Sequence, residues 1–222
     1  MKSNNESLYY DCSYEDIKKL HNLGSVGCMR TYFATLRFLH PKRRDAWPKN
    51  GTVAKITGLN VTTVNKSYAK LVRAGVLNKQ KTGTYESVRY SFTAKGKSYI
   101  RMCDESIMII MCLNGTEISM YLKCLLYANR KSGDMYASKG EIVKRTGRSL
   151  SGVKKAKRSL ITKGILLDTG RVIETGIRRG AHVYHIKGLY FTKKNGSRET
   201  RNVKLGGHSA TDRRKRKEDY YL

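Results

Sequence analysis

Residues 29–77 read MRTYFATLRFLHPKRRDAWPKNGTVAKITGLNVTTVNKSYAKLVRAGVL, and the same pattern returns without a gap at 118–166. The offset is a constant 89 residues, and 13 of the 49 aligned positions are identical. A period of this length exceeds that of solenoid repeats and matches the size of a small domain. The chain of 222 residues is therefore predicted to contain two copies of one fold.

The composition indicates a polyanionic partner. The sequence has 45 Lys and Arg residues against 17 Asp and Glu residues, which gives a formal net charge of +28 at pH 7. Nucleic acid is the first interpretation of such an excess, and an anionic membrane surface is the second. A basic protein without such a partner is disfavoured, because self-repulsion of this size opposes compaction.

The cysteines and the apolar runs indicate the cellular compartment of the protein and whether it binds a metal. The five cysteines are odd in number and include no CxxC pair, which disfavours both a zinc site and a disulfide framework. Free thiols indicate a reducing compartment, and we expect a cytoplasmic protein with no cofactor and no metal. The N-terminus has no apolar signal region, and the longest apolar run, 107–113, is too short to span a membrane.

Hydrophobic periodicity and turn residues predict several helices and one hairpin in the first copy. Ser13 is expected to cap the first helix and Gly24 to end it. Gly58 makes a turn between two later helices, and Asn60 or Thr62 caps the second of them. The predicted order is helices at 14–22, 26–39, 52–57 and 63–74, strands at 76–79 and 87–92, and a closing helix from 93 towards 102.

The second copy repeats this plan after a segment, 106–113, whose pattern fits either a strand or a buried helix. Helices are predicted at 118–128, 140–145 and 152–163, and strands at 165–169 and 181–186 flank a long basic hairpin. Beyond residue 192 the hydrophobic periodicity is lost. We therefore expect a first domain at 1–105, a second at 106–192 and a disordered basic tail at 193–222.

A helix, a tight glycine turn, a second helix and a two-stranded hairpin form the layout of a winged helix-turn-helix. In the first copy Ala54 is small where the two helices cross, and Gly58 permits the turn. Val64, Tyr68 and Leu71 form the predicted inward face of the second helix. The predicted fold class is mainly α with small β-hairpins (α+β), arranged as two tandem winged helix-turn-helix domains. One copy could instead have become a packing or dimerisation module.

The second helix of such a motif enters the major groove with its N-terminal half against base edges. Asn can bond adenine in two places, Lys can reach guanine, and Thr can contact a thymine methyl. The residues of the first copy that face away from the core are therefore predicted to contact DNA: Asn60, Thr62, Thr63, Asn65, Lys66 and Lys70.

The corresponding helix of the second copy is more basic and poorer in amides, so it is expected to rely more on phosphates. Its predicted contacts are Ser149, Ser151, Lys154, Lys155 and Arg158. The hairpins are expected to touch the backbone or the minor groove through Lys79, Lys81, Arg178, Arg179 and His182. Lys157 stands where the first copy has Tyr68, and its aliphatic stem is expected to cover core surface.

Several strings carry a family resemblance, namely Tyr121-Leu, Leu125-Leu-Tyr-Ala-Asn129, Lys131-Ser-Gly-Asp134, Tyr136-Ala-Ser138 and Thr146-Gly147. With them the second copy resembles the helix-turn-helix module of plasmid and phage replication initiators. In the first copy, Tyr90-Ser-Phe-Thr-Ala-Lys-Gly96 resembles the end of the wing in bacterial winged-helix repressors. The resemblance covers roughly residues 26–190. It implies a mobile-element protein that acts at an origin or a promoter, with replication or transcription machinery as further partners.

Two other classes of function compete with this interpretation. An architectural or RNA-binding protein would use charge alone, but most of the 15 tyrosines fall inside helix or strand patterns and form no stacking platform. An enzyme is disfavoured because no nucleotide-binding glycine loop, paired metal carboxylates or nucleophile motif is present, and no catalytic residue is predicted.

Two heads on one chain can contact two successive major grooves about one helical turn apart. We therefore expect a monomer with pseudo-dimeric architecture, or a homodimer, on double-stranded DNA. The expected site consists of two related or directly repeated half-sites, with no membrane partner.

Overall fold

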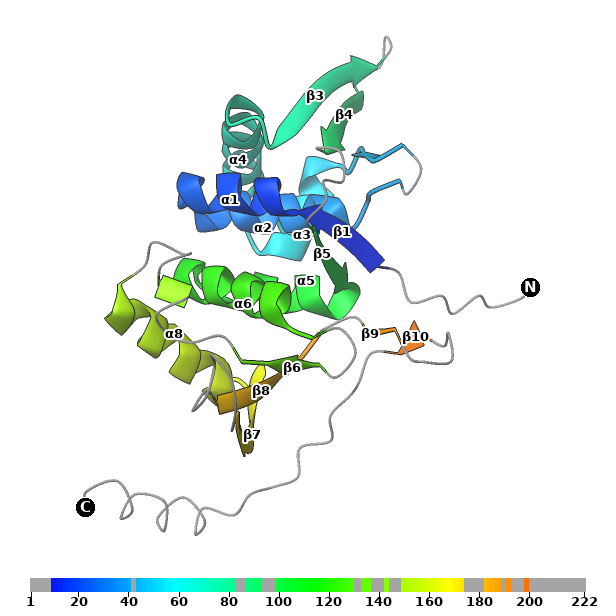
Figure 1. Ribbon diagram of the computed structural model, residues 1–222. Helices are drawn as coiled ribbons and strands as arrows, with labels where there is room; N and C mark the ends of the chain where they lie inside the picture. The colour runs from blue at the N-terminus through cyan, green and yellow to red at the C-terminus, as the bar shows by residue number, and fades with distance from the viewer. Residues whose placement is uncertain are drawn as a thin grey trace.

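The computed structural model describes residues 9–40, 43–82, 87–92, 99–129, 133–136, 142–143, 149–173, 182–188, 191–192 and 198–199. Its elements follow in the order β1 (Tyr9–Ser13), α1 (Tyr14–Leu23), α2 (Val26–Leu36), β2 (Asp45–Ala46), α3 (Asn50–Thr57), α4 (Val61–Arg73), β3 (Leu77–Thr82), β4 (Ser87–Phe92), β5 (Tyr99–Cys103), α5 (Asp104–Met111), α6 (Gly115–Tyr127), β6 (Asp134–Met135), α8 (Leu150–Thr162), β7 (Leu166–Val172), β8 (His182–Ile186), β9 (Phe191–Thr192) and β10 (Arg198–Glu199). In Figure 1 the elements from α1 to β4 form an upper lobe, and those from α6 to β8 form a lower lobe.

Local sequence sets the ends of α1 and the start of α4. The Ser13 hydroxyl accepts a hydrogen bond from the backbone N–H of Asp16 at 3.3 Å, and Gly24 ends α1 with φ at +60°. The Asn60 side chain accepts a hydrogen bond from the backbone N–H of Thr63 at 2.7 Å and thereby starts α4. The predicted caps at Ser13, Gly24 and Asn60 are confirmed.

The predicted inward face of α4 is also confirmed. Val64, Tyr68 and Leu71 are buried, and α4 packs against α2. The Tyr68 hydroxyl shares a hydrogen bond of 2.6 Å with the Thr35 hydroxyl of α2. Because this apolar face is held in the core, the rotation of α4 about its axis is determined, and so is the face that meets solvent.

Two three-stranded antiparallel sheets have the same strand order, β2-β4-β3 in the upper lobe and β6-β8-β7 in the lower lobe. Asp45 lies opposite Ser91 in the first sheet, and Asp134 lies opposite His185 in the second. The predicted hairpins are confirmed in β3–β4 and in β7–β8. The short third strands, β2 and β6, were not predicted because two residues are too few to show an alternating pattern.

A tight turn precedes each of these short strands. The backbone N–H of Arg44 donates to the His40 carbonyl at 2.9 Å, and that of Gly133 donates to the Asn129 carbonyl at 2.7 Å. Both Arg44 and Gly133 are left-handed, with φ at +55° and +76°. The chain therefore turns soon after α2, which ends at Leu36, earlier than the predicted residue 39.

Two predictions at the junction between the lobes are corrected by the structure. The predicted closing helix towards 102 is wrong over Tyr99–Cys103, which is strand β5 and pairs antiparallel with β1. Its partner residues lie about 90 positions away, so local periodicity cannot reveal the pairing. The segment 106–113, which fitted either a strand or a helix, falls largely within α5.

The predicted disordered tail is also corrected in part. Arg198–Glu199 forms β10 and pairs antiparallel with β9. The rest of 193–222, the wing segment 174–181 and most of the helix predicted at 140–145 lie outside the described residues, although 142–143 are helical. The domain boundary after residue 105 stays a prediction. Within the part of the chain that the structure describes, every helix is too short or too polar to span a bilayer.

Candidate nucleic-acid interface

The solvent face of α4 carries the residues predicted to read DNA. Thr62, Asn65, Lys66 and Lys70 are exposed, and Thr63 is half-buried. They lie opposite the buried face that holds α4 against α2. The structure therefore gathers an amide, hydroxyls and ammonium groups on one face of one helix, as base and phosphate contacts require.

Two predicted contact residues serve the helices themselves. Asn60 uses its side-chain oxygen to cap α4, and the Ser149 hydroxyl accepts from the backbone N–H of Gly152 at 3.2 Å to cap α8. The Ser149 hydroxyl also lies 3.1 Å from that of Ser151. Both side chains therefore fix the residue at which their helix starts, so their role is to stabilise the helix more than to contact a base.

Asn65 is held by Asn50, a residue that the sequence pattern does not single out. The Asn50 side-chain amide, at the first residue of α3, donates to the Asn65 side-chain oxygen at 2.6 Å. This bond orients the Asn65 amide and directs its own N–H donors away from α3. Asn50 could not be chosen from spacing alone, because it belongs to a different helix and lies 15 residues earlier.

The turn between α3 and α4 is fixed by Gly58 and Thr57. Gly58 is left-handed with φ at +68°, a conformation that a side chain disfavours. The buried Thr57 hydroxyl donates to the Val53 carbonyl at 2.8 Å and accepts from the backbone N–H of Leu59 at 3.3 Å. These bonds hold α4 at a set angle to α3. The equivalent turn of the second copy lies outside the described residues.

The outer face of α8 is strongly basic. Ser151, Lys154, Lys155 and Arg158 are exposed, whereas Val153 on the other side of the helix is buried. The predicted orientation of this helix is thereby confirmed. Ammonium and guanidinium groups without a neighbouring amide suit phosphate oxygens, because they carry charge and no mixed donor–acceptor pattern.

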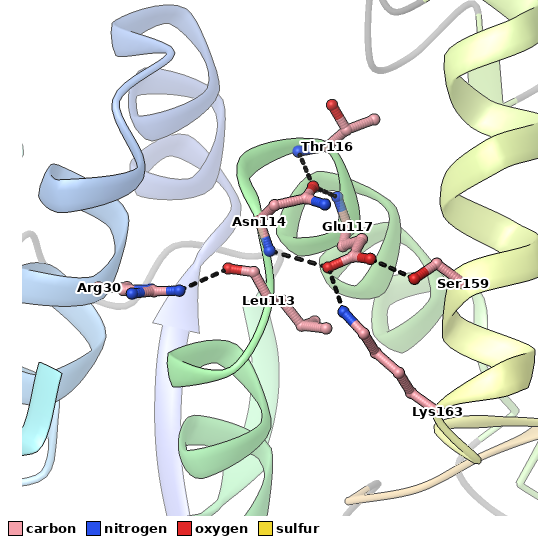
Figure 2. A network of polar contacts seen from close by, with 7 residues as sticks. All are labelled: Arg30, Leu113, Asn114, Thr116, Glu117, Ser159 and Lys163. Atoms are coloured by element: carbon pink, nitrogen blue, oxygen red, sulfur yellow. Dashed lines mark hydrogen bonds and ion pairs between the residues drawn. The ribbon is translucent and has the colours of Figure 1, made fainter. Parts of the chain in front are cut away.

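A buried carboxylate connects α8 to α6 (Figure 2). Glu117 accepts hydrogen bonds from the Lys163 ammonium at 2.7 Å, from the Ser159 hydroxyl and from the backbone N–H of Asn114 at 2.9 Å. Burial acts to raise the pKa of Glu117, but the hydrogen bonds from Lys163 and Ser159 outweigh it and hold the pKa below its usual value. A charged Glu117 therefore supports the position of α8.

Lys157 replaces an aromatic stack by a cation–π contact. In the upper lobe the rings of Tyr68 and Tyr90 are parallel, with centroids 4.0 Å apart. At the equivalent place in the lower lobe, the Lys157 ammonium lies 4.1 Å from the centroid of the Tyr184 ring. α4 and α8 thus contact their sheets at equivalent positions, α4 through stacked aromatic rings and α8 through a cation–π contact.

The hairpins are described only in part. Lys79 is exposed on β3, whereas the Lys81 side chain and both Arg178 and Arg179 lie outside the described residues. His182 is exposed on β8, and its ring nitrogen lies 3.9 Å from the Asp168 carboxylate. A neighbouring carboxylate makes this position less favourable for a phosphate than that of Lys79.

Two exposed apolar residues also belong to the candidate interface. Val61 and Leu150 are the first residues of α4 and α8, and they are 46% and 47% exposed. Large aliphatic side chains at the same exposed position of both helices can contact thymine methyl groups. Their equivalence under the 89-residue offset could have indicated a shared role at the start of both helices. Their apolar side chains instead indicate core positions when the sequence is considered alone.

A cationic aromatic cluster lies beside the first sheet. Trp47 is 48% exposed, and the guanidinium carbons of Arg43 and Arg89 lie 5.0 and 5.5 Å from its ring centroid. Asp45 lies 3.5 Å from each of these two arginines and fixes their positions. The cluster offers positive charge next to the sheet that carries the hairpin β3–β4.

The described residues hold no group of three His, Cys, Asp or Glu side chains that could bind a metal ion. All five cysteines are free, and all of them except Cys112 are buried. Burial raises the pKa of the Cys124 thiol to about 12, so this thiol stays protonated. The prediction that the chain is not an enzyme stays a prediction.

Comparison with protein families places residues 34–77 in a known class, described as a helix-turn-helix domain. The match begins within α2, includes α3 and α4, and ends at the first residue of β3. Residues 34–77 form a helix-turn-helix domain. The match supports DNA binding by this part of the chain, in which α4 is the second helix. No curated protein sequence matches the chain.

Proposed function

We propose that the chain binds a specific duplex-DNA sequence through two winged helix-turn-helix heads. The observation that carries the proposal is the exposed face of α4, where Asn65 and Lys66 project from a helix whose opposite face is buried. An amide that is oriented by Asn50 has the mixed donor and acceptor character that base edges recognise.

The second head is supported by equivalent elements at the same offset. α8 follows α6 as α4 follows α2, each reading helix starts with a side-chain cap, and the two sheets share one strand order. We propose that α8 supplies phosphate contacts and weaker base discrimination. Its basic face and the formal net charge of +28 support this assignment.

The proposed biological setting is the cytoplasm, at an origin or promoter of a plasmid or phage. There the chain acts as a replication initiator or as a transcription regulator, in contact with the corresponding machinery. Family resemblance of the sequence supports this setting. Clustered repeats of the bound sequence would favour an origin, and one or two sites beside a promoter would favour regulation.

Selection from random duplex DNA with the purified full chain tests the proposal. We expect one enriched sequence, and Asn65→Ala or Lys66→Ala should lose preference at particular bases by on the order of 1–3 kcal/mol. Lys18→Ala, which removes an exposed lysine from α1, is the matched control and should leave the preference unchanged. Enrichment of no sequence, with a steep dependence on salt, would instead establish a non-specific architectural or RNA-binding protein.

A further inference from the structure

We infer that the two copies are related by a local half-turn, so that the duplex site presents its two half-sites in opposite orientations. The inference rests on the proposed function of two DNA-reading heads and adds the symmetry of the target. A direct tandem arrangement would instead face both heads in the same direction along the DNA.

The ribbon formed by β1 and β5 gives the first observation. Each of these strands directly precedes the first helix of its copy, α1 or α5, so the two strands are equivalent. They run antiparallel, and their central residues, Asp11 and Arg101, lie opposite each other. A pure translation would leave equivalent strands parallel, whereas a half-turn about an axis through the centre of the ribbon makes them antiparallel.

Each first helix is attached to its own copy by hydrogen bonds. The Tyr32 hydroxyl of α2 donates to the Asp16 carboxylate of α1 at 2.9 Å. Tyr121, which is equivalent to Tyr32 in the repeat, donates to the Lys187 carbonyl at 2.9 Å, and the Ser106 hydroxyl of α5 donates to the adjacent Gly188 carbonyl. The strands therefore report the relative orientation of the whole copies, because each is continuous with a helix that is fixed in its copy.

The starts of α2 and α6 give a second point on the axis. Val26 and Gly115 are the first residues of these helices and are equivalent under the 89-residue offset. They also touch, since a Cβ atom built on Gly115 would lie only 2.9 Å from a methyl carbon of Val26. Equivalent positions of two rotated copies meet only close to the rotation axis, and the antiparallel β1 and β5 make that rotation a half-turn.

Two further contacts between the copies are reciprocal at the level of the helices. Arg37, the residue that follows α2, forms an ion pair of 2.7 Å with Asp104 of α5. Lys123 of α6 lies 3.4 Å from the Tyr14 hydroxyl of α1, with its ammonium 4.8 Å from the ring centroid. The second helix of each copy thus contacts the first helix of the other, which is the pattern of an isologous interface.

The half-turn between the copies determines the relative orientation of the two DNA half-sites. Figure 1 shows α4 with its hairpin at one end of the molecule and α8 with its hairpin at the other, with β1 and β5 between them. A twofold pair of helix-turn-helix units reads half-sites of opposite orientation. Because α4 presents Asn65 where α8 presents Lys154, the two half-sites differ in sequence while their orientations are opposed.

Directed cleavage of the bound DNA tests the orientation. A cutting reagent is attached to one cysteine at a time in full-length Cys112→Ser protein, because Cys112 is the exposed native cysteine. Thr62→Cys and Ser151→Cys place it at equivalent positions of α4 and α8, and Lys79→Cys and Asp168→Cys at equivalent positions of β3 and β7. The Cys112→Ser protein without a new cysteine is the control and should give no localised cutting.

We expect the cuts to have a mirrored order along the selected site. The two cuts made from α4 and α8 should both lie between the two cuts made from the hairpins, or both should lie outside them. An alternating order of hairpin, helix, hairpin, helix would overturn the half-turn and leave the proposed function intact. Cutting of two separate duplexes by one protein would overturn the single site with opposed half-sites, and it too would leave the proposed function intact. Absence of any selected sequence would overturn the proposed function, and the inference with it.

Reversing one half-site gives an independent measurement. The half-site whose protection is lost in Arg158→Ala is reversed while its distance from the other half-site is kept. We expect the affinity to fall by about 100-fold, towards that of a single head, because both heads can no longer engage together. Tighter binding after the reversal would overturn the inferred orientation.

Discussion

At the scale of single residues, the exposed polar side chains of α4 divide by their partners. Asn60 is engaged by the backbone of its own helix, and Asn65 is engaged by the side chain of Asn50. Lys66 and Lys70 extend from the same exposed face. The two asparagines Asn60 and Asn65 therefore differ in the hydrogen-bonding groups that remain available to DNA.

Asn50→Ala should relax the base preference that depends on Asn65. The lost hydrogen bond of 2.6 Å frees the Asn65 amide to rotate, and discrimination at that base should fall by about 1 kcal/mol. Competition binding with a single-base variant of the selected site measures this loss. A double-mutant cycle with Asn65→Ala decides the mechanism, because fully additive losses would show that Asn50 acts independently.

Asn60→Ala should lower the free energy of unfolding by about 1 kcal/mol, because the backbone N–H of Thr63 loses its acceptor. Asn60→Ser retains a capping oxygen and should recover most of the stability. Urea unfolding of the two variants measures the difference. A normal stability of Asn60→Ala combined with a change in base preference would assign Asn60 to reading instead.

At the scale of elements, α4 and α8 are held in place by different interactions. α4 is held to α2 by the apolar face of Val64, Tyr68 and Leu71, whereas α8 gains the ionic contact of Lys163 with Glu117. The apolar attachment does not depend on pH. The ionic attachment depends on the charge of Glu117.

Glu117→Gln should destabilise the protein by about 2 kcal/mol at neutral pH, because charge-assisted hydrogen bonds to a buried carboxylate are lost. The folded pKa of Glu117 lies below its usual value, so its contribution is complete above the unfolded pKa of about 4.3. The contribution disappears as the pH falls through the folded pKa. Thermal unfolding of both proteins between pH 7 and pH 3 should show the two curves converging at low pH, and a constant gap would contradict the assignment.

At the scale of the whole molecule, the ribbon of β1 and β5 joins the two lobes. Its central pair is an ion pair, in which the Arg101 guanidinium donates to both carboxylate oxygens of Asp11 at 2.8 and 3.1 Å. The Arg30 guanidinium of α2 adds a bond of 3.1 Å to the Leu113 carbonyl, next to the cap of α6 (Figure 2). These contacts set the relative position of the two lobes.

Asp11→Asn should weaken binding to a complete site more than binding to a single half-site. The uncharged amide loses part of the bidentate contact, on the order of 1–3 kcal/mol, and the two heads are then less well aligned. Fluorescence anisotropy with both duplexes measures the two affinities. The exchanged pair Asp11→Arg with Arg101→Asp should recover the complete-site affinity, and equal losses on both duplexes would show a general defect in folding.

Short-range patterns were sufficient for much of the fold. The spacing of Val64, Tyr68 and Leu71 predicted the buried face of α4, and Gly24 and Asn60 predicted helix ends. These succeed because helical periodicity and capping depend on residues within one or two turns. The strand β5 was missed because its hydrogen-bonding partner, β1, is distant in the chain.

The sequence by itself determined the repeat, the basic character of the chain and the side of α4 and α8 that faces solvent. Only the tertiary structure decided that Asn50 holds Asn65, that Glu117 holds α8, and that equivalent strands of the two copies run antiparallel. Amphipathic patterns record which residues leave water, a property of each local segment. Partners and orientation depend on contacts between segments far apart in the chain, so they exist only once the chain has folded.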